Sequence, residues 1–486
     1  MSAGHGARLL ALRCDALAGR SSDAIVDLVD YFDPDLVYIV REKTNMRVVT
    51  RIRRHCDQPV IHSRNGPDTI RTETVGDVSF AFIPATDFID GASTAGDAVP
   101  DPVDFVAADD LEMTPDAVSM DAALDGLDDI ARHQARTEGA TTYLSGSLEA
   151  SYDYVWRATP DGTTVRLPVR GIAPLRRSGA PEIACLSCDA EGRVAVTSVP
   201  SDRFGLQAVT GVGTTMAHRL KENGYETRSD IARTAEAELR TIRGVGKSTA
   251  RTIRGSARAL AEGRVIRQTD ASVPAGEYTP LFVDIETDGL SPTIIWLIGV
   301  YDPTRDEYTD FVDTTPSHDE PGHATRDFVS WLASEYERPS LITWNGHQFD
   351  YKHLSRFIAG YASDYSEYWG ESVFEYDLYD WAVRKGNAIL PGRTNRLEDV
   401  AEAVGRDRDA TAAAVDGKTL ARTVQRVLQS PDRAGEVDWN AARAYCEADV
   451  RELAAVYDAI VEATPGRERA DVPTDGTTTQ TGLLDF

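Results

Sequence analysis

Short apolar runs alternate with amphipathic stretches along residues 1–86. Runs such as "RLLAL" and "DLVYIV" have the length of buried strands, whereas "SDAIVDLVDYF" repeats its apolar residues at helical spacing. This pattern predicts a small α/β unit. Between residues 136 and 202, runs such as "YDYVWRA" and "RVAVTSV" are separated by the turns "PDG" and "AEG". That alternation predicts a small β-rich region, and neither pattern indicates a function.

The stretch between these two regions is acidic. Residues 87–131 hold 13 Asp or Glu and no Lys or Arg, with Ala, Pro and Gly among them. Segments with many like charges and few large apolar residues stay solvated because they cannot bury enough surface to fold. We therefore expect an acidic linker over residues 87–135, with one helix near "MDAALDGLDDIARHQ".

Two copies of one pattern follow, 33 residues apart. The segments "LQAVTGVGTTMAHRL" (206–220) and "LRTIRGVGKSTARTI" (239–253) each place two apolar residues before Gly-Val-Gly and an Ala four residues after it. Two helices joined by a tight turn explain the pattern, because glycine adopts backbone angles that other residues avoid. The glycines concerned are Gly211, Gly213, Gly244 and Gly246. The pattern predicts an all-α domain over residues 203–264.

This repeat resembles the helix-hairpin-helix pair of DNA repair and recombination proteins. The resemblance implies that hairpin amides and a helix N-terminus hold the phosphate backbone without reading bases. The local charge agrees, since residues 206–264 hold 11 Lys or Arg against 6 Asp or Glu. The expected nucleic-acid contacts are the four glycines and four basic residues, Arg243, Lys247, Arg251 and Arg254. A hairpin pair that binds protein, or that only supports the fold, is the alternative.

A third pattern predicts a larger α/β domain over residues 280–463, after a linker at 265–279. Its first strand lies in "LFVDIETDGL" (281–290). Side chains alternate along a strand, so Asp284 and Glu286 point to the same face. Two neighbouring carboxylates repel each other unless a cation lies between them, and hard oxygen ligands suit Mg²⁺ or Mn²⁺. A charged strand edge without a metal would have the same local sequence.

Two further segments add acidic groups. In "LITWNGHQFDYKHLSRFI" an apolar strand ends near Asn345, and Asp350 opens a helix. Open α/β sheets place active groups at such strand-to-helix junctions. In the helical stretch "ARAYCEADVRELAAVYDAIV", Tyr445 and Asp449 are four residues apart and therefore share a face. Taken singly, Tyr445 is also consistent with a packed aromatic residue, and Asp449 with a solvated charge.

Together these segments resemble the DEDD family of 3′–5′ exonucleases in its tyrosine version. The stretches "YCEADV" and "NRLEDVAEAVGRD" (395–407) are most similar to the YprB-type ribonuclease-H-like branch. The resemblance implies a mixed sheet with flanking helices. It implies a catalytic set of Asp284, Glu286, Asp350, Tyr445 and Asp449. It further implies that the four carboxylates hold two divalent ions, Mg²⁺ or Mn²⁺, while the tyrosine orients the attacking water.

The resemblance therefore predicts a metal-dependent 3′–5′ exonuclease acting on nucleic acid, DNA rather than RNA, in repair or replication. Two alternatives stay open: a catalytically inactive DNA-binding scaffold, and a ribonuclease-H-type endonuclease acting on RNA. His347 and His353 flank the second motif, where a phosphate contact and ordinary packing both fit. Lys385, Arg393 and Arg396 are candidates to line the path of the strand.

Residues 464–486 have a Thr-, Pro- and Gly-rich composition typical of disorder. Within them, Gln480, Leu483 and Phe486 have a spacing that resembles the peptide that docks on the DNA sliding clamp, the PCNA-interacting motif. The second aromatic residue of that motif is missing. The resemblance implies a clamp partner, and the alternative is a tail that docks on its own domain.

Overall charge and the cysteines bound this picture. The net charge of −27 opposes nucleic-acid binding by the chain as a whole. Asp-rich, Lys-poor surfaces also keep proteins soluble in concentrated salt, where screening weakens repulsion, so we favour a salt-adapted organism. Five scattered cysteines give no disulfide framework. No stretch approaches the ~18 apolar residues that span a bilayer, and the N-terminus lacks an apolar run with a cleavage site. We expect a soluble cytoplasmic protein without a membrane partner.

Overall fold

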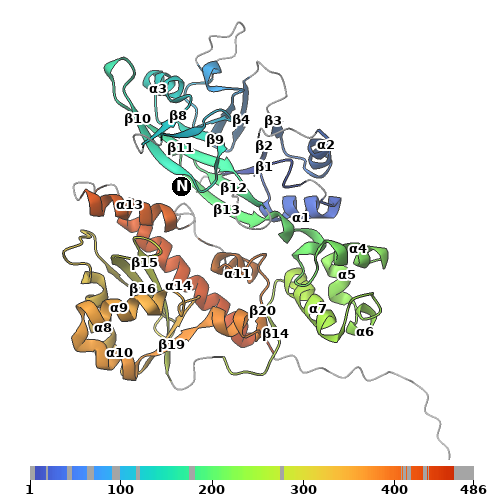
Figure 1. Cartoon of the computed structure of the whole chain (residues 1–486), viewed down its shortest axis with the longest axis vertical. Helices are drawn as coiled ribbons and strands as arrows, with labels where there is room; N and C mark the ends of the chain where they lie inside the picture. The colour runs from blue at the N-terminus through green and yellow to red at the C-terminus, as the bar shows by residue number, and fades with distance from the viewer. Residues whose placement is uncertain are drawn as a thin grey trace, which may run out of the picture.

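Three folded units follow one another along the chain in the computed structural model (Figure 1). The structure describes residues 6–464 except 18–19, 41–45, 63–69, 90–98, 117–120, 175–180, 274–277, 407, 409–411, 413–416, 431–434 and 436. The units are a two-sheet N-terminal unit, a helical unit and a C-terminal unit built on one mixed sheet. The expected fold class, a multidomain α/β protein with a mixed sheet flanked by helices and an all-α hairpin domain, is confirmed.

The N-terminal unit contains two sheets and spans residues 7–200. The first sheet, in spatial order, consists of β13 (Val194–Pro200), β12 (Glu182–Cys188), β1 (Ala7–Leu12), β2 (Leu36–Ile39) and β3 (Val60–His62). The second consists of β10 (Asp153–Ala158), β11 (Val165–Ala173), β9 (Thr142–Glu149), β6 (Phe105–Ala108), β5 (Val78–Phe82) and β4 (Arg71–Val75). A hairpin of β7 (Met113–Asp116) and β8 (Asp121–Leu124) adds to them, and the helices are α1 (Ser22–Phe32), α2 (Met46–His55) and α3 (Leu127–Arg136).

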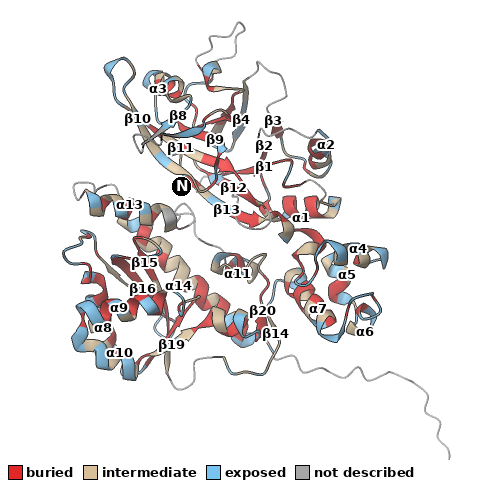
Figure 2. Ribbon diagram, viewed as in Figure 1, coloured by how far each residue is buried: buried red, intermediate tan, exposed pale blue. Residues whose placement is uncertain are grey.

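These elements stack in four layers, helix, sheet, sheet and helix. Side chains alternate along β1, so Leu10 packs on α1 and α2 while Leu9 packs between the two sheets. On the outer face of the second sheet, Tyr143 packs with Ile130 of α3. Figure 2 shows the buried positions concentrated along these strands and on the inner faces of the helices.

The expected acidic linker at residues 87–135 is wrong. Strand β6 is an interior strand of the second sheet, paired in parallel with both β5 and β9. The apolar run Phe105–Ala108 is fully buried, and the acidic residues around it bond to neighbouring groups: Asp104 accepts bonds from the backbone and hydroxyl of Ser79. The regions 1–86 and 136–202 are likewise not separate, because β1 of the former pairs with β12 of the latter.

The helical unit repeats one local conformation twice. Its elements include a short 3₁₀ turn (Gly205–Ala208), α4 (Thr214–Glu222), α5 (Arg228–Arg233), α6 (Glu236–Leu239) and α7 (Lys247–Glu262). Gly211 and Gly244 have φ of 86° and 91°, which glycine alone adopts without strain. Gly213 and Gly246 precede α4 and α7 with extended backbones, φ −81° and −84°. The need for special backbone angles therefore applies to the first glycine of each pair and not to the second.

The C-terminal unit has a five-stranded mixed sheet. In spatial order the strands are β17 (Glu307–Val312), β16 (Ile295–Asp302), β15 (Thr279–Thr287), β18 (Pro339–Thr343) and β19 (Phe374–Asp377). Strand β15 is antiparallel to β16 and parallel to β18. The helices are α8 (His323–Glu335), α9 (Asp350–Tyr361), α10 (Ser366–Ser372), α11 (Leu397–Ala403), α13 (Gly417–Gln429) and α14 (Trp439–Glu462). A short pair, β14 (Ile266–Arg267) with β20 (Ala388–Ile389), anchors the segment expected as a linker.

The two faces of this sheet carry different helices. Val283 and Ile285 face a core formed with α8, α9 and α10. Phe282 and Leu297 face the other side, which α11, α13 and α14 cover. Asp284 and Glu286 point to the same face of β15 as Phe282, because alternate residues of a strand share a face. Their side chains therefore project toward α14. Among the helices of the described residues, none has the length and apolar character that a bilayer crossing requires.

Candidate active site

Three carboxylates converge where β15 passes under α14. Asp284 and Glu286 come from the strand and Asp449 from the helix, and one oxygen of each lies within 4.8 Å of the others. Glu286 is buried, whereas Asp284 and Asp449 are half-buried. The sulfur of Cys446, on the same helix, lies 3.9 Å from an Asp284 oxygen. The strand period and the helix period thus bring together residues that are more than 160 positions apart.

A glycine on the neighbouring strand makes this approach possible. Gly299 of β16 lies opposite Asp284 in the sheet register. A Cβ at this position would lie 2.5 Å from the sulfur of Cys446, so any larger residue would push α14 away from the sheet. Gly299 is not predicted as a site residue from the sequence, because a single glycine within an apolar strand carries no signal of what packs against it.

Asp288 fixes the turn that follows the two strand carboxylates. Its carboxylate accepts bonds from the backbone amides of Thr293 and Ile294, at 2.8 and 3.2 Å, and from the Thr293 hydroxyl at 2.6 Å. The acidic residues of "DIETDG" therefore do different work. Asp284 and Glu286 face the site, and Asp288 holds the connection to β16.

The fourth carboxylate, Asp350, begins α9 and is buried. The loop that leads to it is held by Asp377 of β19, whose carboxylate accepts the amides of Asn345 at 3.0 Å and His347 at 3.1 Å. Asn345 itself has φ of 70°, a left-handed conformation that asparagine tolerates better than most residues. Asp350 lies outside the set of oxygens within 4.8 Å, but its charge acts on both Asp284 and Glu286.

The carboxylates disfavour one another's ionised forms. Burial, and then the charge of Asp350, raises the pKa of Asp284 well above its usual range. Burial, followed by the charges of Asp284 and Asp449, does the same to the pKa of Glu286. Burial raises the pKa of Asp350 to about 7. A cluster that resists ionisation in this way gains most from a nearby cation.

Tyr445 lies one helical turn before Asp449. The charge of Asp449, with burial and the charge of Glu286, raises the pKa of Tyr445 well above its usual range. The phenol therefore keeps its proton and can donate a hydrogen bond, but it cannot act as a base near neutral pH.

Arg408 is a cation that the sequence analysis did not anticipate at the site. Its guanidinium bonds to Asp449 and, at 2.7 Å, to both oxygens of Glu452 one turn further along α14. It also lies over the ring of Tyr445, 5.1 Å from the centroid. Burial alone would lower the pKa of Arg408, but the bonds to Glu452 and the charge of Asp449 outweigh it, so the group stays charged.

The donor set fits a divalent cation. All of its groups are carboxylates, the ligands that Mg²⁺ and Mn²⁺ prefer, and their mutual repulsion is relieved only in part by Arg408. Asp284, Glu286 and Asp449 are the residues best placed to hold an ion.

Residues 281–461 match the RNase H superfamily. Residues 205–259 match the SAM-like helix-hairpin-helix tandem, and a comparison with curated proteins finds no match. Two solved structures of Escherichia coli exonuclease I are similar to this chain. One is the zinc-bound form of a complex with single-stranded DNA, and the other is a complex with a dA16 oligonucleotide. Both are 18% identical, cover 33% of this chain, and have TM-scores of 0.21 and 0.22. The matches cover 42% and 43% of those chains, less than half of each.

The chain thus contains an RNase H superfamily domain and a helix-hairpin-helix tandem, and the superfamily match with the acidic cluster supports a nuclease.

In the tandem, Arg243, Lys247 and Arg251 are exposed, as are the hairpin glycines. Arg254 is half-buried, with its Nε enclosed by protein. The expected clamp residues Gln480, Leu483 and Phe486 lie outside the described residues.

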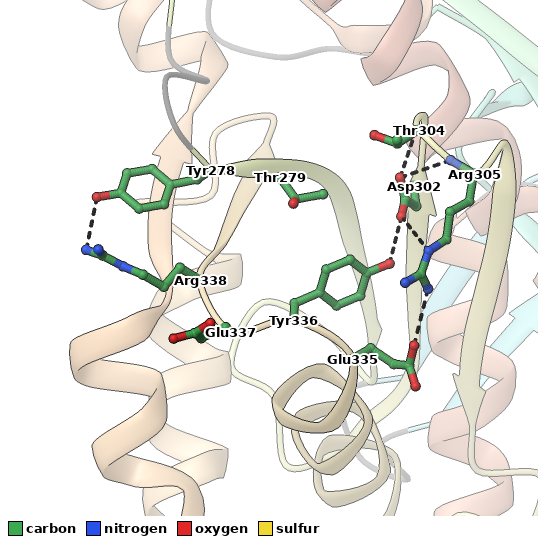
Figure 3. Close-up of a pocket in the computed structure, with 9 residues that line it drawn as sticks. All are labelled: Tyr278, Thr279, Asp302, Thr304, Arg305, Glu335, Tyr336, Glu337 and Arg338. Atoms are coloured by element: carbon green, nitrogen blue, oxygen red, sulfur yellow. Dashed lines mark hydrogen bonds and ion pairs between the residues drawn. The ribbon is translucent and has the colours of Figure 1, made fainter.

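Several other candidates have ordinary packing roles. His353 is buried against Phe349, with ring centroids 4.7 Å apart, and burial lowers its pKa. Arg393 does not line a strand path, because it bonds to Asp27 of the N-terminal unit. In a hollow of about 530 Å³ at the far end of β15, Arg305 bonds to Glu335, and Asp302 accepts the Tyr336 hydroxyl (Figure 3).

Proposed function

We propose that the chain is a metal-dependent 3′–5′ exonuclease of the DEDD class, in its tyrosine version and nearest the YprB-type branch, acting on DNA in repair or replication. The observation that carries the proposal is the convergence of Asp284, Glu286 and Asp449, with oxygens within 4.8 Å of one another, beside buried Asp350. The helix-hairpin-helix tandem supports DNA over RNA because it resembles the pairs found in DNA repair and recombination proteins. Its exposed hairpin residues suit phosphate contacts.

In this proposal the four carboxylates would hold two divalent ions, Mg²⁺ or Mn²⁺, which would supply charge neutralisation at the phosphate and activation of the attacking water. Tyr445 keeps its proton and donates a hydrogen bond that orients this water. Arg408 holds Asp449 in place through its bonds to α14, and burial of Glu286 keeps bulk water from that side of the site.

The test is the release of nucleotides from an end-labelled single-stranded oligonucleotide with Mg²⁺ or Mn²⁺. We expect Asp284→Asn and Asp449→Asn each to lower kcat by at least a hundredfold, because removing one charge disrupts both ion sites. The matched control is Asp364→Asn, an exposed aspartate of the same domain, which should keep full activity. Equal rates for Asp284→Asn and the parent would refute the site.

The same assay separates the competing functions. A 5′-labelled strand should shorten stepwise, whereas a circular strand should stay intact; cleavage of the circle would indicate an endonuclease. Parallel DNA and RNA strands give the preference. Absence of saturable Mn²⁺ binding by calorimetry would indicate the inactive scaffold instead.

We further propose that the tail binds a sliding clamp through Gln480, Leu483 and Phe486. The support is the spacing of these residues in the sequence alone. Loss of clamp binding on Leu483→Ala with Phe486→Ala, measured by titration of the full chain into purified clamp, is the expected outcome.

A further inference from the structure

A second pocket lies in the C-terminal unit, where β18 ends. It has a volume of about 410 Å³, and its lining combines aromatic rings with basic and amide groups: Trp344, Asn345, Tyr379, Arg384, Asn395 and Arg396. Unlike the hollow in Figure 3, it includes no carboxylate among its lining residues. It therefore presents a positively charged, ring-lined surface in a chain that is acidic overall.

The chain connections place this pocket next to the candidate active site. Asn345 starts the loop that ends at Asp350, and the loop is held by Asp377. On the other side, Arg396 is two residues before Glu398, whose charge raises the pKa values of Asp284 and Asp449. In the sheet, Ile342 of β18, two residues before Trp344, pairs with Phe282 of β15, two residues before Asp284, so the Trp344 wall of the pocket lies near the acidic cluster.

The rings are fixed in place. Trp344 and Tyr379 meet edge to face, 5.5 Å between centroids, and the indole N–H donates to the Asn395 carbonyl at 3.1 Å. Both side chains are half-buried, so part of their surface is open. Arg384 lies over the Tyr379 ring at 5.2 Å and donates to the Asn345 side chain at 2.6 Å. Pre-positioned rings lose little entropy when a flat ligand stacks on them.

The cations of the pocket differ in how they are paired. Within the described residues, Arg384 has no carboxylate at ion-pair distance, and it is exposed. Arg396 reaches the N-terminal unit instead, where it donates to the Ser198 carbonyl at 2.8 Å and lies 3.4 Å from Glu182. Arg384 is thus available to an anion, and Arg396 closes the pocket against the neighbouring unit.

We propose that this pocket binds an unpaired nucleobase of a single-stranded nucleic acid, with the base stacked on the Trp344 ring and its edge against Tyr379, and with a phosphate held by Arg384. The proposal rests on the proposed function for its ligand class. Stacking on aromatic rings is tolerant of sequence, because every base has a flat face. A base held here would keep the strand single and direct the adjoining phosphodiester toward the carboxylates.

The test compares two oligonucleotides of about a dozen nucleotides, within the length that single-strand sites cover, one with all its bases and one with abasic sugars. Binding is measured by fluorescence anisotropy on the full chain, in EDTA and at one fixed salt concentration, so that hydrolysis cannot occur. Phosphate contacts by the hairpins are the same for both oligonucleotides. The difference between their two affinities therefore reports base stacking alone.

We expect the parent to bind the strand with bases about tenfold more tightly. Trp344→Ala should abolish this difference, Trp344→Phe should restore it, and Tyr278→Ala, in the hollow of Figure 3, should leave it unchanged. Arg384→Ala should lower the affinity for both oligonucleotides equally. If Trp344→Ala fails to fold, Tyr379→Ala gives the same comparison.

The two proposals fail separately. An unchanged base preference in the Trp344 and Tyr379 variants overturns the pocket even if nucleotides are released with Mn²⁺. A base preference that depends on these residues, in a protein that releases no nucleotides, retains the pocket and overturns the nuclease.

Discussion

Arg408 links two carboxylates that lie one turn apart on α14. Glu452 is almost fully enclosed, with 3% of its side chain exposed, and Arg408 is the cation that neutralises it. Removing one partner of a buried ion pair leaves an uncompensated charge, which costs about 3 kcal/mol or more. We therefore predict that Arg408→Met lowers the free energy of unfolding by about 3 kcal/mol, measured by denaturant unfolding in EDTA.

A double substitution provides the control. Glu452→Gln removes the charge that Arg408 neutralises, so combining it with Arg408→Met should restore part of the lost stability. The two effects should be strongly non-additive, as for residues in direct contact. Additive effects would show that the pair contributes nothing specific.

The raised pKa values predict how metal binding depends on pH. Burial raises the pKa of Asp350 to about 7, so the folded metal-free protein holds a proton there that the unfolded chain has lost. Its stability should fall as pH rises from about 4 to 7, and an ion must displace that proton. We predict that Mn²⁺ affinity, measured by calorimetry, increases as pH rises through about 7. A flat affinity across this range would contradict the prediction.

The site residues that the sequence predicts are those governed by a regular period. Asp284 and Glu286 follow the two-residue repeat of a strand, and Tyr445 and Asp449 the four-residue repeat of a helix. Arg408 follows no such repeat, because it lies in a segment between α11 and α13 where no spacing indicates which face a side chain occupies. The convergence of these elements depends on tertiary packing, which no local pattern encodes.

At the scale of elements, the site depends on how closely α14 lies against β16. A methyl group at Gly299 would meet the sulfur of Cys446 at 2.5 Å and Tyr308 at 3.1 Å. We predict that Gly299→Ala displaces the helix, costs about 1–3 kcal/mol, and weakens Mn²⁺ binding because Asp449 moves away from Asp284. Thermal unfolding and calorimetry measure the two effects.

Gly360 provides a matched substitution in the same unit. It lies on the exposed side of α9, and a Cβ there meets nothing within 4 Å. Gly360→Ala should be neutral or stabilise by up to about 1 kcal/mol, since alanine favours helix. Cys446→Ala should in turn rescue part of the Gly299→Ala defect. A Gly299→Ala protein with parental Mn²⁺ affinity would show that the close approach is not required.

At the scale of the whole molecule, the sequence predicts the helical and C-terminal units better than the N-terminal one. The hairpin repeat and the C-terminal domain are contiguous, so local pattern indicates them. The N-terminal sheets pair β1 with β12, which are about 170 residues apart, and their interior strand β6 lies within an acidic stretch. Charge averaged over such a stretch hides a four-residue buried strand, and for this reason the linker prediction is wrong.

One carboxylate joins all three units. Asp27 of α1 accepts the amide of Gly205 at 2.7 Å, and bonds in pairs to Arg228 of the helical unit and Arg393 of the C-terminal unit at 2.6–3.0 Å. Its side chain is 14% exposed, and Arg393 also lies over the rings of Tyr31 and Phe204. Burial alone would raise the pKa of Asp27, but the arginines outweigh it and the net pKa is lowered.

Asp27 should therefore control how firmly the units dock. A lowered pKa in the folded state stabilises the protein above the ordinary value of 3.8 and ceases to do so as pH falls through the folded value. We predict that Asp27→Asn costs about 3 kcal/mol or more at neutral pH, because two arginines lose their buried partner. The substitution should also split the single calorimetric unfolding transition into several. Because the titrating carboxylate is gone, the variant should lose less of its inter-unit docking than the parent when the pH falls. Asp364→Asn, an exposed aspartate of the C-terminal unit, is the control and should leave the transition unchanged. If Asp27→Asn unfolds as a single transition with the same acid dependence as the parent, the units are held together by their other contacts, such as those of Arg396 with β12 and β13.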